Sequence, residues 1–429
     1  MPSNTGIVVC SVPGRLECVQ VKPPQSSEAE PGKTPQPEPG KRQPTPAEDA
    51  PESQAPKARD SVRRAHRTPR SRPDRTGYLR LDLGECARPA SPRILTALQQ
   101  LAPEDLSRYP DNTKLRRKLA ELHRVELQQV IITAGSDEAI RWTFAAFVEE
   151  GARVLIPRPT FGAFLTAAEA AGAFVERVDY LEDLSFPNDE FHRRLAPRTP
   201  RVAVLANPNA PTGTSLPSAT VLEFARLSSS TLFLINESFA SYQGHSLLDL
   251  EELPANVLVL RSFSKDYGLA GMRIGYLVGA PEVISALSVV RPAHTVSTAA
   301  LQAASVAVEE QAAMLAQVTE LRAVMERLVR QLAQRSIEAH ATAANFVLIK
   351  LSSPIQPWAA AFAAHGILVG SWGHVGPMAS YIRVTVNNDV ESSRFLDTLE
   401  LILRQGIPGA ARVEGVPGEW NELGSEGMA

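Results

Sequence analysis

Short runs of apolar residues recur along the middle of the chain, separated by longer stretches with helical periodicity. Such runs, bounded by polar or turn residues, are typical of strands buried on both faces of a sheet. Most of them are far enough apart for a helix to cross between strands, so the pattern predicts a mainly parallel α/β sheet. The predicted strands are Val130 to Thr133, Arg153 to Ile156, Val202 to Ala206, Leu232 to Ile235, Val257 to Leu260 and Ile274 to Val278.

The pattern changes after these strands. Residues 302–335 form a long helical pattern without proline or glycine. Two further predicted strands follow it, Asn345 to Lys350 and Tyr381 to Val386. We therefore expect a smaller α+β domain at the C-terminal side. The predicted organisation is an N-terminal arm at residues 76–102, a large domain at 103–292 and a small domain at 293–408.

Both ends of the chain differ in composition from the middle. The first 75 residues hold 14 of the 34 prolines, and such a segment buries too little apolar area to offset the chain entropy of folding. We expect residues 1–75 to be a disordered tail and residues 409–429 to be a second tail. Lys57 to Arg75 is basic, which suits an acidic partner but is more typical of a solvated linker.

Composition and charge narrow the class of protein. The chain has 429 residues, 44% of them hydrophobic, and a net charge of −3, which argues against nucleic acid as the main partner. Cys10, Cys18 and Cys86 are too scattered for a disulfide framework or a zinc site, so no metal is implied. Neither a signal peptide nor a membrane span is readable. We expect a cytoplasmic protein that acts on a small molecule.

A lysine stands among groups that suit a phosphorylated aldehyde. Lys265 follows a predicted strand in the segment LRSFSKDYGLAGMRIGY, with Ser262 and Ser264 just before it and Arg273 eight residues after it. A buried lysine with a lowered pKa forms an imine with an aldehyde cofactor, while hydroxyls and a guanidinium hold its phosphate. The alternative is a surface lysine in a polar loop. It is less attractive because arginine is the usual surface cation of this chain.

Polar motifs also follow other predicted strands, at the edge where ligands bind in open α/β sheets. Ser136 and Asp137 join a strand to a helix, whose N-terminal amides can bind an anion. Phe161 follows the next strand and either stacks on a planar ring or fills the core. The segment ANPNAPTGTSLP, from Ala206 to Pro217, forms a polar turn, and the strand after it leads into Asn236.

In this order the motifs resemble those of the fold-type I, class I/II aminotransferases, and within them the histidinol-phosphate aminotransferase group with its relative threonine-phosphate decarboxylase. The resemblance runs from about Gly77 to Leu403 and includes LSRYPDN, GSDE, NPNAPTG, SFSK, GLAGMRIGY and YIRVTVN. It implies pyridoxal 5'-phosphate as cofactor, a large domain on a mainly parallel sheet, a smaller α+β domain, and a homodimer with shared active sites.

The resemblance also assigns roles to single residues. Lys265 would form the imine with the cofactor, and Tyr109 would reach the phosphate in the neighbouring subunit. The groups that would hold the phosphate within the subunit are Ser136, Asp137, Ser262, Ser264 and Arg273. Phe161 would cover the cofactor ring. Arg383 would bind the substrate carboxylate, a role that its planar fork suits, the alternative being a structural ion pair.

Several positions around the cofactor ring depart from the family pattern. The family has an aspartate at the position of Asn236, where it pairs with the pyridine nitrogen. It also has hydrogen-bond donors to the phenolic oxygen at the positions of Ala210 and Phe239. A charge-assisted hydrogen bond is worth about 1.5–3 kcal/mol, so loss of the aspartate pair is expected to slow a carbanion-dependent step by one to several powers of ten. Phe161 replaces a tyrosine but keeps the ring face.

The substrate side departs as well. Phosphate-bearing substrates of this group use a second arginine where this chain has Gly370, and LDLGECARPASP replaces an asparagine-containing segment. We therefore expect an α-amino acid substrate. Three functions fit the sequence: an aminotransferase with altered cofactor electronics; another pyridoxal-phosphate reaction such as elimination, replacement, cyclisation, decarboxylation or oxidation; and a non-catalytic protein that keeps the fold for binding.

Overall fold

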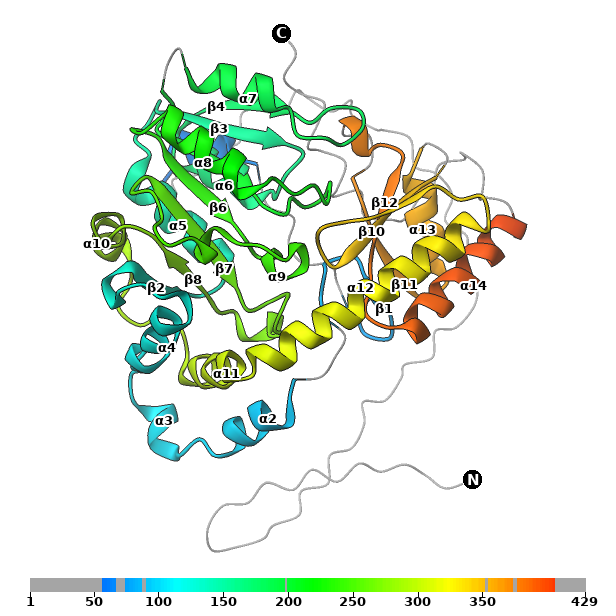
Figure 1. Cartoon of the computed structure of the whole chain (residues 1–429), viewed down its shortest axis with the longest axis horizontal. Coiled ribbons are helices and arrows are strands. Elements are labelled where there is room, and N and C mark those ends of the chain that lie inside the picture. Colours follow the sequence, from blue (N-terminus) through cyan, green and yellow to red (C-terminus); the bar gives the residue numbers. More distant parts are fainter. Residues whose placement is uncertain are drawn as a thin grey trace, which may run out of the picture. The chain divides into compact units, whose positions relative to one another are not determined.

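The large sheet carries most of the candidate site residues. The computed structural model describes residues 56–66, 74–86, 90–196, 199–351, 354–372 and 376–405. Its larger sheet has seven strands in the order β2-β8-β7-β6-β5-β3-β4 (Figure 1). The strands are β2 (Val130–Thr133), β3 (Arg153–Arg158), β4 (Phe174–Asp179), β5 (Val202–Ala206), β6 (Leu232–Asn236), β7 (Val257–Ser262) and β8 (Gly275–Val278).

The direction of the strands confirms the predicted mainly parallel sheet. Strands β4, β3, β5, β6 and β7 pair in parallel, and β8 is antiparallel to both β7 and β2. All six predicted strands are present with small shifts at their ends. Strand β4 was not predicted, because its sequence FVERVD carries charged residues and only one of its side chains is buried.

Helices cover both faces of this sheet, and the strand pleat decides which side chains meet which helices. One face packs against α5 (Ser136–Phe147), α6 (Ala163–Ala170) and α10 (Pro281–Val290). The other packs against α4 (Thr113–His123), α7 (Asn188–Leu195), α8 (Ser218–Leu227) and α11 (Thr298–Glu309). In β6, Leu232 and Leu234 belong to the α5 face, whereas Phe233 and Ile235 belong to the other. By this alternation Asn236, the last residue of β6, lies on the α5 face.

The small sheet has five strands in the order β1-β11-β12-β10-β9. These are β1 (Leu79–Leu81), β9 (Ala339–Ala341), β10 (Phe346–Lys350), β11 (Ile367–Ser371) and β12 (Tyr381–Thr385). Their core is shared with α12 (Gln311–Ala333), α13 (Gln356–Ala364) and α14 (Asp389–Gln405). The predicted smaller α+β domain is therefore confirmed. Strand β1 joins this sheet from the N-terminal side of the chain by pairing in parallel with β11.

The single long helix expected over residues 302–335 is wrong, because the chain forms two helices that meet at Glu310. Helix α11 packs against α4 and against α2 (Pro92–Gln99), whereas α12 contributes to the core of the small sheet. The two halves serve different cores, and no proline or glycine marks the break. The Glu310 carboxylate accepts a hydrogen bond from Ser91, at the start of α2.

The N-terminal segment also departs from expectation in part. Residues 60–64 form a short helix, α1 (Asp60–Arg64), inside the region expected to be disordered. Ser61 and Arg59 donate to the carbonyl oxygen of Ala170, at the end of α6, and His66 contacts the Glu169 carboxylate at 2.7 Å. These partners lie more than a hundred positions away, so local composition did not reveal them. Residues 1–55 and the tail expected at 409–429 lie outside the described residues.

Two further short helices are α3 (Pro103–Ser107) and α9 (Ala240–Gln243). Among the described residues, none of the helices combines the length and apolar character that crossing a membrane requires.

Candidate active site

The large sheet brings two candidate segments together at one edge. Gly275 in β8 pairs with Ser262 at the end of β7 and with Thr133 at the end of β2. A side chain on Gly275 would place its Cβ 2.7 Å from the Arg261 carbonyl oxygen, so glycine permits this close approach. The register therefore sets the start of α5, which follows β2, beside the serines that precede Lys265.

These segments form a group that we call the phosphate cradle: Ser136, Asp137, Ser262, Ser264 and Arg273. The Arg273 guanidinium lies 3.3 Å from the Asp137 carboxylate. It also lies against Gly135, where an added Cβ would come within 2.8 Å of Arg273 Nη2. Gly135 has φ of +82°, a conformation that favours glycine. The backbone N–H of Ser264 donates to Ser262 Oγ at 3.1 Å, which fixes the two serines relative to each other.

The cradle has the chemistry of a phosphate site. Helix α5 begins at Ser136, and the first amides of a helix have no acceptor within the helix and carry its positive dipole end. Arg273, which is half exposed, adds a fixed positive charge, and the two serines add hydroxyl donors. The residues present therefore fit the phosphate of the cofactor that the resemblance implies.

Lys265 is placed as a reactive amine. Its Nζ donates to the Leu83 carbonyl oxygen at 2.5 Å. Burial, together with the positive charges of Arg383 and Arg273, lowers the pKa of Lys265 to about 8, while the carboxylates of Glu85 and Asp82 oppose the shift. A lysine with this pKa is partly uncharged near neutral pH and can act as a nucleophile. The alternative of a surface lysine does not match this environment.

The candidate ring residues lie on the α5 face. Phe161 packs against the same hydrophobic core cluster as Leu232 and Leu234, and its ring meets Phe164 edge to face at 6.0 Å. Asn236 ends β6 on that face and is buried. Both positions are therefore available to a flat ring beside the phosphate cradle.

The remaining ring positions offer few donors. Phe239 is buried, and its ring centroid lies 5.7 Å from Lys265 Nζ. Asn209, the neighbour of Ala210, does not replace the missing donor. Its amide nitrogen already donates to the Pro159 carbonyl and to Thr212 Oγ1, and its oxygen accepts from Thr160.

Arg383 occupies an unusual environment in the small sheet. Its guanidinium lies between the rings of Phe346 and Trp372, at 5.0 and 4.7 Å from their centroids. Burial lowers its pKa to about 10. Within the described residues it makes no ion pair, and its buried Nε has no hydrogen-bond partner. A desolvated guanidinium with an unused donor is suited to an incoming carboxylate and does not fit the alternative of a structural ion pair.

The N-terminal arm covers these two cations, a feature that the sequence did not reveal. The Asp82 carbonyl accepts from Arg383, as the Leu83 carbonyl does from Lys265. Gly84 N–H donates to Thr385 Oγ1 at 3.0 Å, and the Gly84 carbonyl accepts from Asn345 Nδ2 at 3.1 Å. The arm is held further by Arg75, which pairs with Asp82 at 2.5 Å and with Glu85 at 3.0 Å. The contacts with the two cations use backbone carbonyl oxygens, which no side-chain pattern encodes.

Two other positions clarify the surroundings. Gly370 faces Arg383 across the β11–β12 pairing, and an added Cβ there would lie 3.2 Å from both the Asp82 carbonyl oxygen and the Trp372 ring. Tyr109 is 83% exposed and stacks on His294 at 4.6 Å. Within the described part of the chain it makes no hydrogen bond to the phosphate cradle.

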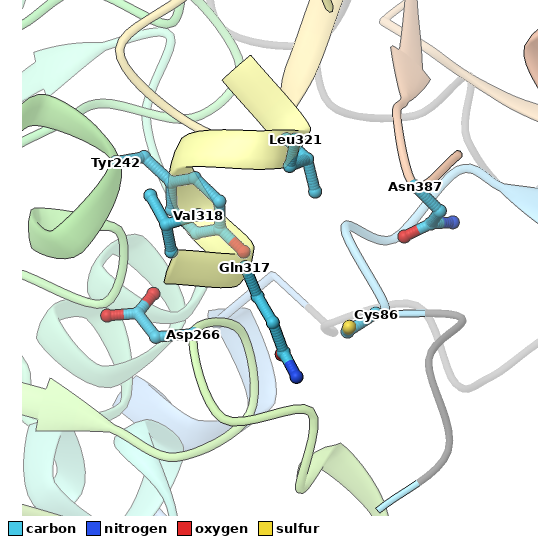
Figure 2. Close-up of a pocket in the computed structure, with 7 residues that line it drawn as sticks. All are labelled: Cys86, Tyr242, Asp266, Gln317, Val318, Leu321 and Asn387. Carbon is cyan, nitrogen blue, oxygen red and sulfur yellow. The ribbon is translucent and has the colours of Figure 1, made fainter. Parts of the chain in front are cut away.

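A small pocket lies beside the residue that follows Lys265. Asp266 is buried, its Oδ2 accepts from Ser241 at 2.5 Å, and its Oδ1 has no partner among the described residues. Burial raises its pKa to about 6 despite the nearby charge of Arg261. Figure 2 shows the residues around this pocket, which are Cys86, Tyr242, Asp266, Gln317, Val318, Leu321 and Asn387. They come from α9, from α12, from the segments that follow β7 and β12, and from the N-terminal arm.

Comparison with known proteins gives consistent matches over this part of the chain. The family model described as aminotransferase class I and II matches residues 76–399. Histidinol-phosphate aminotransferase 1 of Carboxydothermus hydrogenoformans is 32% identical over 311 residues, covering 71% of this chain and 86% of that protein. Histidinol-phosphate aminotransferase of Ruminiclostridium cellulolyticum is 27% identical over 333 residues, covering 76% of this chain and 92% of that protein.

The fold has a solved counterpart. The crystal structure of histidinol-phosphate aminotransferase from Sinorhizobium meliloti in complex with pyridoxal-5'-phosphate has a TM-score of 0.70. It shares 24% sequence identity and covers 76% of this chain and 91% of that one. The likeness shows that the two chains share a fold.

Proposed function

The chain belongs to the family of class I and II aminotransferases, and from this premise we propose that it transfers the amino group of an α-amino acid with bound pyridoxal 5'-phosphate. When bound, this cofactor supplies an electron-withdrawing ring that stabilises negative charge at the substrate Cα. The observation that carries the proposal is the convergence of Lys265, with its lowered pKa, and the phosphate cradle at one edge of the large sheet.

Lys265 supplies the amine that attaches the cofactor and, once released from it, the base that moves a proton at Cα. The cradle holds the phosphate through the first amides of α5, the hydroxyls of Ser262 and Ser264, and the charge of Arg273. Phe161 covers the ring through its aromatic face. The other pyridoxal-phosphate reactions and the non-catalytic reading have no observation of comparable weight in their favour.

Arg383 selects the carboxylate of the substrate. Its buried guanidinium has an unused Nε and contacts two aromatic rings, which restrict the orientation of its planar fork. The relatives are named for histidinol phosphate, but the position that would supply a second phosphate-binding arginine is Gly370, whose space is bordered by Asp82 and Trp372. An α-amino acid therefore suits this side of the site better than a phosphate ester.

The proposed organisation extends to domains and assembly. The large domain, extended past the expected boundary at residue 292 to include α11, carries the cofactor, and the small domain that follows carries Arg383. Tyr109, exposed on its own subunit, reaches the cofactor phosphate of a second copy, which makes the working form a homodimer. Mixing inactive Tyr109→Phe and Lys265→Ala chains and measuring recovered activity tests this arrangement.

Visible absorption spectra test the function directly. The purified chain is mixed with pyridoxal phosphate, and the band of the attached cofactor is followed through a panel of amino acids and histidinol phosphate. We expect a band in the wild type that an α-amino acid shifts, with the corresponding 2-oxo acid as product. Arg383→Gln should keep the band but weaken the response, whereas Arg327→Gln, an exposed arginine paired with Asp389, should behave as wild type. A chain that forms no band, or responds only to histidinol phosphate, contradicts the proposal.

A further inference from the structure

Asn236 makes a pair of hydrogen bonds that fix the orientation of its amide. Its Oδ1 accepts from the Ser238 backbone N–H at 3.1 Å and from Ser238 Oγ at 2.6 Å. A backbone N–H is only a donor, so the atom it meets must be the amide oxygen. The chemistry of the contact therefore settles which end of the amide is oxygen. Both lone pairs of Oδ1 are then in use, and the Nδ2 group points the other way.

The Nδ2 group of Asn236 is the donor left over at this end of the sheet. It makes no hydrogen bond to any described residue. It is also not fully buried by the described residues, so a bound ligand can reach it. The adjacent polar side chains are committed elsewhere. Asn207 donates to and accepts from the Leu216 backbone, and Glu237 accepts from Ser246 and from the Leu247 N–H.

The shape of the cofactor brings its pyridine nitrogen to this donor. The aldehyde carbon must reach Lys265 and the phosphate must reach the cradle. The ring nitrogen is para to the carbon that bears the aldehyde, so it lies on the side of the ring away from Lys265. Asn236 ends the strand that pairs with β7, and it lies on the α5 face with the cradle. It is the polar side chain at that position.

We propose that Ser238 holds Asn236 as a hydrogen-bond donor to the pyridine nitrogen, so that this chain keeps the nitrogen of its cofactor unprotonated. A protonated nitrogen would bring its own N–H against the Asn236 N–H, and Oδ1 has no lone pair free to accept it. An amide also carries no negative charge to stabilise a pyridinium. Ser238 is a positioning residue that acts through Asn236. The inference rests on the proposed function and specifies the electronic state of its site.

A neutral ring nitrogen has a chemical consequence for the reaction. A bound cofactor in this state would supply a ring that withdraws electrons less strongly. Lys265 would then have to take up and return the Cα proton with little delay, which places more weight on its position beside the arm.

Nitrogen-15 NMR of the bound cofactor tests the inference without relying on turnover. Wild type, Ser238→Ala and Asn236→Asp are reconstituted with pyridoxal phosphate labelled at the ring nitrogen. We expect the wild-type signal in the range of an unprotonated pyridine from about pH 6 to about pH 9. Asn236→Asp should move the signal to the protonated range. Ser185→Ala, a serine that donates to Asp183 and makes no contact with Asn236, should match the wild type.

Ser238→Ala separates positioning from a merely structural role. With only the backbone N–H left on Oδ1, the amide turns at the cost of one hydrogen bond instead of two, so we expect a signal that becomes pH-dependent and a cofactor Kd raised about two- to tenfold, the effect of losing one hydrogen bond. Ser238→Thr keeps the hydroxyl and should restore the wild-type signal. A protonated nitrogen in the wild type, or a Ser238→Ala signal identical to it, overturns the inference.

The same samples distinguish this failure from failure of the proposed function. Borohydride reduction followed by peptide mapping shows whether the labelled cofactor is attached to Lys265. Attachment with a protonated nitrogen overturns the inference and leaves the proposed function standing. Absence of attachment at Lys265 overturns both.

Discussion

The two ends of the proposed cofactor site differ in how much of the family pattern they keep. At the phosphate end, Ser136, Ser262, Ser264 and Arg273 are all present and are brought together by the pairing of β7, β8 and β2. At the ring end, Asn236, Ala210 and Phe239 stand where the family has an acid and two donors. Anchoring the cofactor and tuning its ring are therefore separable tasks, and this chain has altered only the second.

The physical origin of the two ends explains the difference. The phosphate end relies on the first amides of α5 and on strand register, both of which survive most side-chain changes. The ring end relies on single side-chain groups. Replacing an acid by an amide at that position leaves the fold unchanged but removes a negative charge. Substitutions at the ring end can therefore alter the reaction without weakening the binding of the cofactor phosphate.

The largest expected effect comes from removing the group that both ends serve. Lys265→Ala should reduce turnover to the level of buffer and prevent covalent attachment of the cofactor, while circular dichroism shows an unchanged fold. The matched control is Lys350→Ala, whose lysine forms an exposed pair with Glu338, and it should keep wild-type rates. An active Lys265→Ala enzyme would show that Lys265 does not attach the cofactor, and the proposed site with its two ends would be wrong.

The next effect sharpens the comparison at the phosphate end. Arg273→Ala should raise the cofactor Kd by about 10- to 100-fold, because a charge-assisted hydrogen bond is worth about 1.5–3 kcal/mol. Fluorescence titration with pyridoxal phosphate measures it, with Arg327→Ala as the control. Unchanged affinity would mean that the phosphate lies elsewhere and that this end is not the conserved one.

The pH dependence of attachment probes the junction between the ends. Since the pKa of Lys265 is lowered to about 8, the reactive uncharged amine is scarce below that pH and abundant above it. Stopped-flow absorbance should show attachment rates that rise about tenfold per pH unit below the pKa and then level off. The nearby charge of Arg383 contributes to the lowering, so Arg383→Gln should move the midpoint upward. A midpoint near the ordinary lysine value would contradict the described environment.

The smallest effect belongs to the ring end. Phe161→Tyr restores a hydroxyl but keeps the aromatic face, so the cofactor Kd should change by less than about threefold. Phe161→Ala loses the face and should raise the Kd by about two- to tenfold, the value of an aromatic contact. Equilibrium dialysis of both variants measures the difference. Equal values for tyrosine and alanine would show that Phe161 only fills the core.

The sequence predicted the parts of the fold that depend on buried aliphatic runs. All eight strands it predicted are present, because β-branched apolar runs such as VLVL and VAVLA favour strands buried inside a sheet. Edge strand β4 was missed because it is charged and largely solvent-facing. The break between α11 and α12 was missed because it reflects which core each half joins, which no local pattern encodes.

The candidate site was predictable only as far as motifs carry it. Lys265, the serines and Arg273 follow from the order of strand ends. The contacts of Asn345 and Thr385 with the arm did not, because they join segments separated by more than 250 residues. Ser238 is only two residues from Asn236, but the sequence does not show which atom of the Asn236 amide it contacts. That orientation comes from the structure.

The arm over Lys265 and Arg383 has a kinetic consequence. Its carbonyl oxygens at Leu83 and Asp82 act as a tethered competitor, present at a high effective concentration that no dilution removes. A ligand binds only during the fraction of time that the arm is displaced, and its apparent affinity falls by that fraction. A ligand that replaces the contact at one cation lowers the cost of displacing the arm from the other. A cofactor attached at Lys265 and a carboxylate at Arg383 should therefore favour each other's binding through the arm.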